Sequence, residues 1–249
     1  MKTSNNFFRV RSRLLAAMLL ISIFCLNACK ETTSPENTAV RHKAASAHPS
    51  IIELVVTQPD NTTAAQIKKI AAEAGIPGGS LYRWKNHYFI FAVIEKPGAF
   101  KKAINTLQGV TIREYPDYFY AFDRSRCATT DSTGDGGEWK HILLTAALVP
   151  DTLLQREYMN AHATQFEQWP EVAQGFCRAQ FRQLLLYRKD DQLVLVISIP
   201  ADKTLDELNP LTAKDNPRVD EWNRQMKKYQ AGIPGTDSSE VWVFPEVLK

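Results

Sequence analysis

Residues 184–199, LLLYRKDDQLVLVISI, are two apolar stretches joined by a short polar turn, which is the pattern of a β-hairpin. Residues 81–94, LYRWKNHYFIFAVI, form a second hairpin of the same kind. The two stretches align without a gap, with Leu81-Tyr82-Arg83 on Leu186-Tyr187-Arg188 and 89–94 on 194–199. A repeat of this length indicates that the chain carries two copies of one structural unit.

The same order of elements surrounds each hairpin. The first copy is predicted to have a strand, a helix, the hairpin, a second helix and an aromatic strand region, at residues 51–57, 62–74, 81–94, 98–107 and 111–122. The second copy repeats this order at residues 140–149, 152–168, 184–199, 217–230 and 241–247. Asp151 is a plausible N-cap for the helix over 152–168.

The order β-α-β-β-α-β is that of the ferredoxin-like unit. The predicted domains are a degenerate ferredoxin-like half at 50–127, a linker rich in Gly, Asp, Ser and Thr at 128–139, and a second half at 140–249. Each sheet has one face covered by helices and one bare, and two such sheets can bury their bare faces against each other. We therefore expect an α+β fold in which tandem units form an intrachain pseudo-dimeric barrel, and a monomer. Two separate domains would leave the bare faces exposed.

The N-terminus is typical of an exported protein. A basic start and a short apolar run, LLAAMLLISIFCL at 14–26, are followed by Cys29, and the segment 26–29, LNAC, resembles the lipobox of bacterial lipoproteins. We expect a signal peptide at 1–28, diacylglycerol on Cys29 and a flexible polar tether at 29–49. The protein would then lie in the bacterial cell envelope, anchored to a membrane on its periplasmic or surface side. The alternatives are an ordinary signal peptide and an uncut membrane anchor.

The net charge gives no reason to expect a nucleic-acid partner. The formal net charge of +3 includes four basic residues of the signal peptide, Lys2, Arg9, Arg11 and Arg13. Removing them leaves a charge of about −1 on the mature chain.

Two cysteines remain in the exported part, Cys127 and Cys177. An oxidising compartment permits a disulfide between them, and two buried free thiols are the alternative. A catalytic thiol is not favoured, because no Cys-His pairing is evident.

The chemistry is concentrated in residues 157–172, EYMNAHATQFEQWPEV. Tyr158 and His162 are four residues apart, which places both side chains on one face of a helix. A buried imidazole and phenol can bind a ligand or transfer protons, although the same stripe could be simple core. No metal-ligand spacing, phosphate loop or serine-nucleophile motif is present.

The second half resembles the L-rhamnose mutarotase family. The resemblance rests on Tyr158, His162 and Trp169-Pro170-Glu171, on the hairpin 184–199 with Tyr187, and on the C-terminal motifs Asn216-Pro217-Arg218, Glu221-Trp222, 226–230 and Trp242. The spacing from His162 to Trp169 exceeds that of the family by about one helical turn. A family tyrosine on the first strand of the hairpin falls on Leu184, and the paired tryptophans of some members are here Trp222 followed by Asn223.

The resemblance implies an isomerase that interconverts the α and β anomers of a free deoxy-aldose such as L-rhamnose or L-fucose, with no metal or other cofactor. His162 would be the acid/base and Tyr158 would bind the sugar or assist with the proton. Trp222, Trp169 and Tyr187 would form walls for the monosaccharide. The first half would be a degenerate second copy that replaces the partner subunit of a dimer. The alternative is a non-catalytic lipoprotein that binds a sugar or a protein on the same fold.

Overall fold

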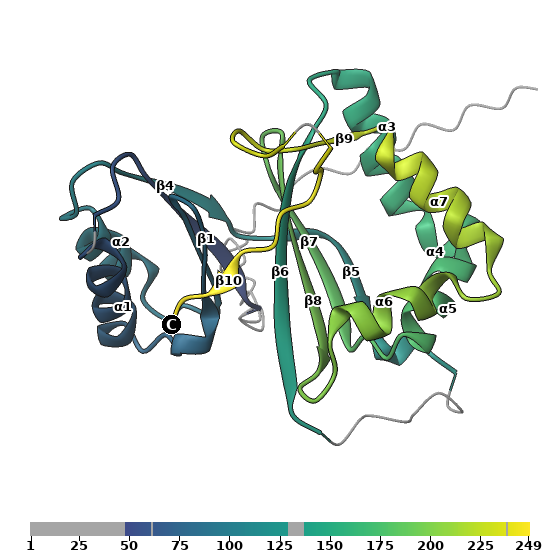
Figure 1. Cartoon of the computed structure of the whole chain (residues 1–249), viewed down its shortest axis with the longest axis horizontal. Coiled ribbons are helices and arrows are strands. Elements are labelled where there is room, and N and C mark those ends of the chain that lie inside the picture. Colours follow the sequence, from purple (N-terminus) through teal and green to yellow (C-terminus); the bar gives the residue numbers. More distant parts are fainter. Residues whose placement is uncertain (1–47, 61, 129–136, 238) are drawn as a thin grey trace, which may run out of the picture. The chain divides into compact units, whose positions relative to one another are not determined.

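The computed structural model describes residues 48–60, 62–128, 137–237 and 239–249 (Figure 1). All of them fall in one unit of the chain, Ser46–Lys249. The predicted signal peptide, Cys29 and most of the predicted tether and linker lie outside the described residues. None of the described helices is long and apolar enough to cross a membrane.

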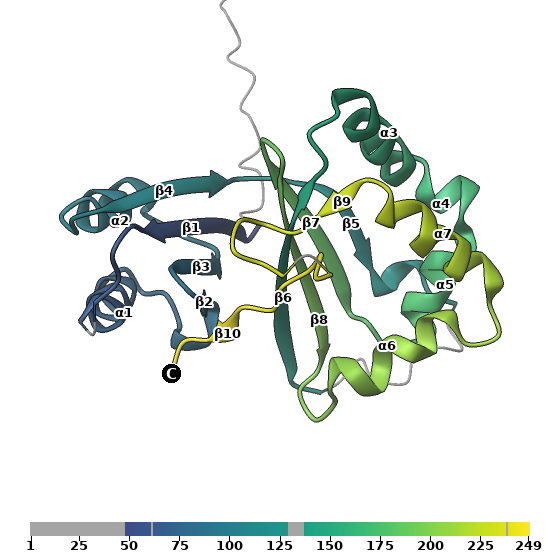
Figure 2. The same cartoon turned by 45° about the horizontal axis from the view of Figure 1, so that its top comes forward.

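The N-terminal half builds a ferredoxin-like sheet. Its elements are β1 (Ser50–Val56), α1 (Thr63–Glu73), β2 (Leu81–Trp84), β3 (His87–Ala92), α2 (Pro97–Ile104) and β4 (Val110–Tyr115), with a 3₁₀ turn at Gly78–Ser80. The strand order is β10-β2-β3-β1-β4, and all pairs are antiparallel. Figure 2 shows α1 and α2 together on one face of this N-terminal sheet.

The C-terminal half repeats the topology. Its elements are β6 (Trp139–Leu148), α3 (Thr152–Ala163), α4 (Gln165–Gln168), α5 (Pro170–Arg178), β7 (Gln183–Lys189), β8 (Gln192–Pro200), α6 (Leu205–Ala213), α7 (Pro217–Lys227) and β9 (Gln230–Ala231). The strand order of this C-terminal sheet is β5-β7-β8-β6-β9. Helices α3 to α7 all lie on one face of it (Figures 1 and 2). The predicted α+β fold with two ferredoxin-like units is confirmed.

The two halves exchange edge strands. Strand β5 (Tyr118–Asp123) follows β4 after Pro116 but pairs with β7 of the C-terminal sheet, and β10 (Glu246–Val247) at the chain end pairs with β2 of the N-terminal sheet. The predictions of a single strand region over 111–122 and of a strand over 241–247 were therefore wrong. Proline cannot donate a ladder hydrogen bond, so the chain leaves one sheet at Pro116 and joins the other.

The helix predicted at 152–168 was wrong in extent. Thr164 interrupts it after α3, and Pro170 then opens α5 as the first residue of a new helix, a position that proline tolerates. The sequence reading also missed α6, although Thr204 and Glu207 form a capping box at its start.

Each sheet is buried on both faces. Helix-facing residues form two separate cores, one in each half. A third core lies between the sheets and joins Ile51, Phe89 and Phe91 of one to Leu185 and Val194 of the other. The expectation that the two bare faces bury each other is thus confirmed, and it explains why β1 is buried on both sides.

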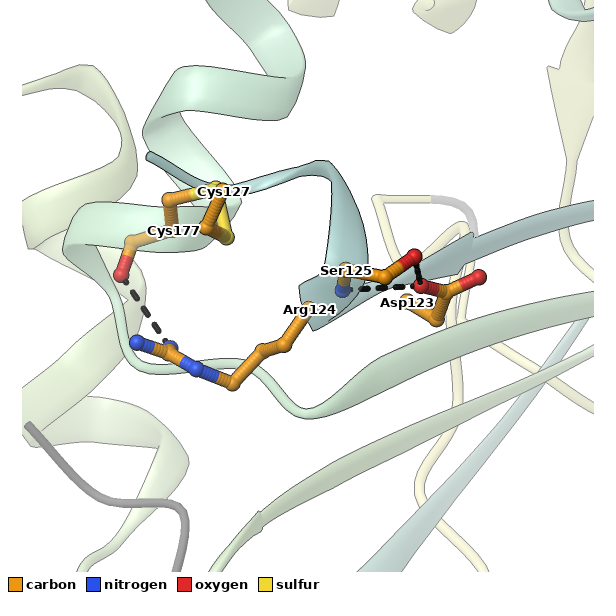
Figure 3. Close-up of a disulfide and its surroundings, with 5 residues drawn as sticks. All are labelled: Asp123, Arg124, Ser125, Cys127 and Cys177. Carbon is orange, nitrogen blue, oxygen red and sulfur yellow. Dashed lines mark hydrogen bonds between the residues drawn. A yellow bond between two sulfur atoms is a disulfide. The ribbon is translucent and has the colours of Figure 1, made fainter. Parts of the chain in front are cut away.

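A disulfide joins Cys127, just beyond β5, to Cys177 in α5 (Figure 3). Beside it, the Arg124 guanidinium donates to the carbonyl oxygen of Cys177 at 3.5 Å, and the Asp123 carboxylate accepts from the backbone N–H of Ser125 at 2.9 Å. Of the two possibilities that the sequence left open, the bonded pair is the one found.

Candidate active site

Helix α3 presents Tyr158 and His162 together. The helix begins at Asp151, whose carboxylate accepts hydrogen bonds from the backbone N–H groups of Leu153 and Leu154 at 2.8 and 3.1 Å, as an N-cap does. Tyr158 and His162 then lie one turn apart, only 1% and 8% exposed, with ring centroids 4.3 Å apart. The four-residue spacing thus places an imidazole beside a phenol in a buried environment.

The hydrogen bonding of His162 fixes where its proton lies. Nδ1 is 3.0 Å from the backbone carbonyl oxygen of Tyr158, and a carbonyl can only accept, so Nδ1 carries the hydrogen. Nε2 on the other side of the ring then holds the lone pair. Burial lowers the pKa of His162 to about 4, partly offset by the bond to the Tyr158 carbonyl. At neutral pH the imidazole is therefore uncharged and Nε2 can accept a proton.

Aromatic rings from two other elements, β5 and α7, enclose His162. The ring centroid of His162 lies 5.2 Å from Tyr120 and 5.8 Å from Phe119 in β5, and 5.2 Å from Trp222 in α7. All three pairs meet edge to face, which is a favourable geometry for aromatic contacts. This shell excludes water from the imidazole and accounts for its low pKa.

Tyr158 is a neutral donor. Burial raises the pKa of its hydroxyl well above the ordinary value, although a hydrogen bond from the Gln230 side chain and the charge of Arg188 lower it in part. The phenol therefore stays protonated over the physiological range. Gln230 also accepts a hydrogen bond from Nε1 of Trp242 at 3.2 Å.

A cavity of about 560 Å³ opens beside these groups, on the helix-covered face of the C-terminal sheet. Its apolar floor comes from β7 and β8, namely Leu184, Leu186, Leu195 and Ile197. Tyr158, His162 and Trp222 line it, and Asn223 and Gln230 add polar groups. A mainly apolar cavity with a few polar groups suits a small ligand that has both kinds of surface.

The structure brings together three of the five predicted sugar-site residues. Tyr158, His162 and Trp222 line one cavity, and Trp169 packs against Trp222 from outside it at 5.6 Å between centroids. Tyr187 lies elsewhere, completely buried between the two sheets, where its hydroxyl donates to the Pro49 carbonyl oxygen at 2.6 Å. Alternation along β7 turns Leu184 and Leu186 toward the cavity and Tyr187 away from it, so the structure does not bring Tyr187 to this cavity.

Sequence reasoning missed the contribution of the N-terminal half. Phe119 and Tyr120 belong to β5, which precedes the linker, and Tyr120 lines the cavity. The one indication in the sequence was the run of aromatic residues at 118–122, YFYAF. It contains more aromatic residues than a strand needs to pack only one of its faces. Among the described residues, no group of three or more His, Cys, Asp and Glu side chains clusters as metal ligands.

A neutral imidazole and a protonated phenol, one helical turn apart on a partly apolar cavity, are groups that can move protons on a small ligand such as a sugar. A carbohydrate isomerase that opens a sugar ring needs a proton acceptor and a proton donor of this kind. Residues 142–247 match the family model for L-rhamnose mutarotase. The C-terminal half of the chain is thus similar to the L-rhamnose mutarotase family, and the match does not extend to the N-terminal half.

A curated relative points the same way. The chain is 29% identical over 92 residues to a protein described as L-fucose mutarotase from Xanthomonas campestris pv. campestris, a match that covers 37% of this chain and 72% of the relative. No solved structure matches the chain significantly.

Proposed function

We propose that this protein is a mutarotase that interconverts the α and β anomers of a free deoxy-aldose such as L-rhamnose or L-fucose by acid/base ring opening. The observation that carries the proposal is the pairing of a neutral His162 with a protonated Tyr158 on one cavity. The family match over residues 142–247 supports the same reaction.

The two groups suit the two proton transfers of ring opening. Nε2 of His162 takes the proton of the anomeric hydroxyl, while the Tyr158 hydroxyl donates its proton to the ring oxygen. The bond between the anomeric carbon and the ring oxygen breaks, and its electron pair goes to the ring oxygen. The aldehyde rotates, and closure on its other face returns both protons, so the protein is unchanged after each turnover.

The other residues that line the cavity can contact the remaining parts of the sugar. Trp222 offers a flat apolar face to the C–H bonds of the ring and to a methyl group, while Asn223 and Gln230 can hydrogen-bond to hydroxyl groups. Leu184 and Leu186 close the apolar side of the cavity.

The test is saturation-transfer NMR between the anomeric protons of L-rhamnose, then L-fucose, with the full-length protein in detergent. We expect the native protein to accelerate exchange, His162→Ala to abolish the acceleration, and Tyr158→Phe to reduce it by about 10²-fold or more. His141→Ala is the matched control, since His141 is also half-buried in the C-terminal half but bonds to Ser198 at 2.8 Å and does not line the cavity.

If the native protein binds either sugar without accelerating exchange, it is a sugar-binding protein on the same fold. If it neither binds nor exchanges these sugars, the proposed activity on rhamnose and fucose is wrong.

We also propose that the protein acts in the cell envelope, held to a membrane by lipid on Cys29. The disulfide between Cys127 and Cys177 supports an oxidising compartment. Metabolic labelling with radioactive palmitate should mark the native protein, and Cys29→Ser should remove the label. An unlabelled native protein in a lipoprotein-producing host would contradict the anchor.

A further inference from the structure

We propose that Tyr120, which comes from the N-terminal half, is a positioning residue of the sugar site. Its ring packs against His162, and its hydroxyl stabilises the corner between α4 and α5 that carries Trp169. The N-terminal half would then complete the site as well as stabilise the fold. The kinetic part of this inference rests on the proposed mutarotase function, whereas the structural part does not.

The exchange of edge strands between the two sheets places Tyr120 at the site. In β5, Tyr120 pairs with Leu186 of β7, and a bulge between Tyr118 and Tyr120 sets which residues face the helices. Tyr120 is 6% exposed and lines the cavity, with its ring edge-on to His162 at 5.2 Å. Its ring therefore occupies space through which water would otherwise reach the imidazole.

The hydroxyl of Tyr120 makes a second contact. It donates to Oε1 of Gln165 at 2.8 Å, and Nε2 of Gln165 donates to the backbone carbonyl oxygen of Trp169 at 2.9 Å. Gln165 is completely buried at the start of α4, so its amide depends on these protein partners. Trp169 packs against Trp222, and Trp222 lines the cavity. A continuous chain of contacts thus leads from Tyr120 to the aromatic wall.

Strand β5 is held along one edge and again just beyond its C-terminal end. Along its length β5 pairs with β7, and just past its end Cys127 is bonded to Cys177 of α5 (Figure 3). The phenol, the corner before α5 and the disulfide therefore belong to one rigid connection between the two halves.

The groups that face His162 are aromatic and uncharged at neutral pH. They are Tyr158 from α3, Phe119 and Tyr120 from β5, and Trp222 from α7. Burial raises the pKa of both tyrosines, so neither supplies a charge. The pKa of His162 is therefore a readout of how well this shell excludes water.

The experiment compares Tyr120→Phe and Tyr120→Leu with matched changes at Tyr118. Tyr118 lies on the same strand but packs against Tyr187 between the sheets, at 5.9 Å between centroids. For each full-length variant, urea unfolding establishes that it is folded. NMR titration of the His162 ring proton gives its pKa without any sugar, and saturation transfer at increasing L-rhamnose gives KM and kcat.

We expect Tyr120→Phe to raise KM about tenfold with kcat little changed, because the wall at Trp169 and Trp222 loses its anchor. Tyr120→Leu should in addition raise the pKa of His162 from about 4 toward the ordinary value. The variants Tyr118→Phe and Tyr118→Leu should leave both quantities unchanged.

Folded Tyr120 variants with native KM and native His162 pKa would overturn the proposal, as would equal changes in the Tyr118 variants. If the native protein accelerates no exchange, the mutarotase proposal fails by itself. The pKa comparison between the leucine variants then still decides whether Tyr120 holds His162.

Discussion

At the scale of single residues, the site depends on how burial changes two side chains. A solvated histidine is partly protonated near neutral pH, but the aromatic shell around His162 disfavours the charged form and leaves a neutral base. The same shell keeps Tyr158 protonated. In the proposed reaction, the two groups on one helix turn then take opposite roles, with His162 accepting a proton and Tyr158 donating one.

The pH dependence of activity follows from the low pKa of His162. A base must be unprotonated in the free protein, so kcat/KM should stay flat from neutral pH down to about pH 5 and fall to half near pH 4. The measurement is the rate of anomer exchange at low sugar concentration, corrected for the buffer, between pH 3.5 and 8. A midpoint near 6.5 would mean that the imidazole is solvated and that the aromatic shell is open.

At the scale of elements, helix α5 is held in place by contacts with several other parts of the C-terminal half. It starts at Pro170, packs against α6 and α7, and carries Cys177 on its last turn. Gly175 lets α5 approach α6 closely, because a Cβ at this position would overlap the carbonyl oxygen of Thr212. The helix is thus fixed by a close backbone contact on one side and by a disulfide on another.

The close approach predicts opposite effects for two helical glycines. Gly175→Ala should lower the free energy of unfolding by about 1–3 kcal/mol, because the two helices must move apart. Gly98→Ala in α2 meets no atom within 4 Å and should be neutral, or stabilising by about 0.5–1 kcal/mol. Urea unfolding of both variants is the measurement, and a neutral Gly175→Ala would contradict the tight packing of α5 on α6.

The disulfide should contribute strongly to stability, because it closes a loop with a sequence separation of 50 residues. Loop-closure entropy gives about 4 kcal/mol for a loop of this size, and engineered removals often show somewhat less. Replacing Cys127 and Cys177 together by Ser should lower the urea midpoint. Reductant should shift the midpoint of the native protein toward that of the double variant and leave the double variant unchanged. A native protein insensitive to reductant would indicate that the bond adds no stability.

At the scale of the whole described unit, the interior between the sheets is mainly apolar but contains a buried carboxylate. Glu53 in β1 is completely buried there and accepts hydrogen bonds from the Tyr115 hydroxyl at 2.8 Å and from Nε2 of Gln192 at 3.1 Å. Nδ1 of His87 is 2.6 Å away. Burial raises the pKa of Glu53, but these hydrogen bonds outweigh it and the net pKa is lowered. The bond to Gln192 ties the carboxylate to the other sheet.

Removal of this charge should therefore weaken the junction between the sheets. Glu53→Gln should lower the free energy of unfolding by about 3 kcal/mol, because the partners of a buried carboxylate are left without it. Glu114→Gln on the neighbouring strand is the control, since its ion pair with Lys101 at 3.1 Å is exposed and should matter by less than about 1 kcal/mol. Equal effects in urea unfolding would show that the Glu53 network adds nothing beyond a surface pair.

Local sequence patterns were enough to predict the repeated order of strands and helices and the pairing of Tyr158 with His162. Both follow from local spacing: alternation marks a strand, and a four-residue step marks one face of a helix. The family motifs in residues 142–247 are likewise readable one after another along the chain.

Long-range packing determined which sheet edge each strand covers. It placed β5 in the C-terminal sheet, turned Tyr187 into the space between the sheets, brought Tyr120 beside His162 and joined Cys127 to Cys177. These contacts link residues far apart in the chain. They depend on which sheet edges and faces remain to be covered once both halves have folded, and no local pattern records that.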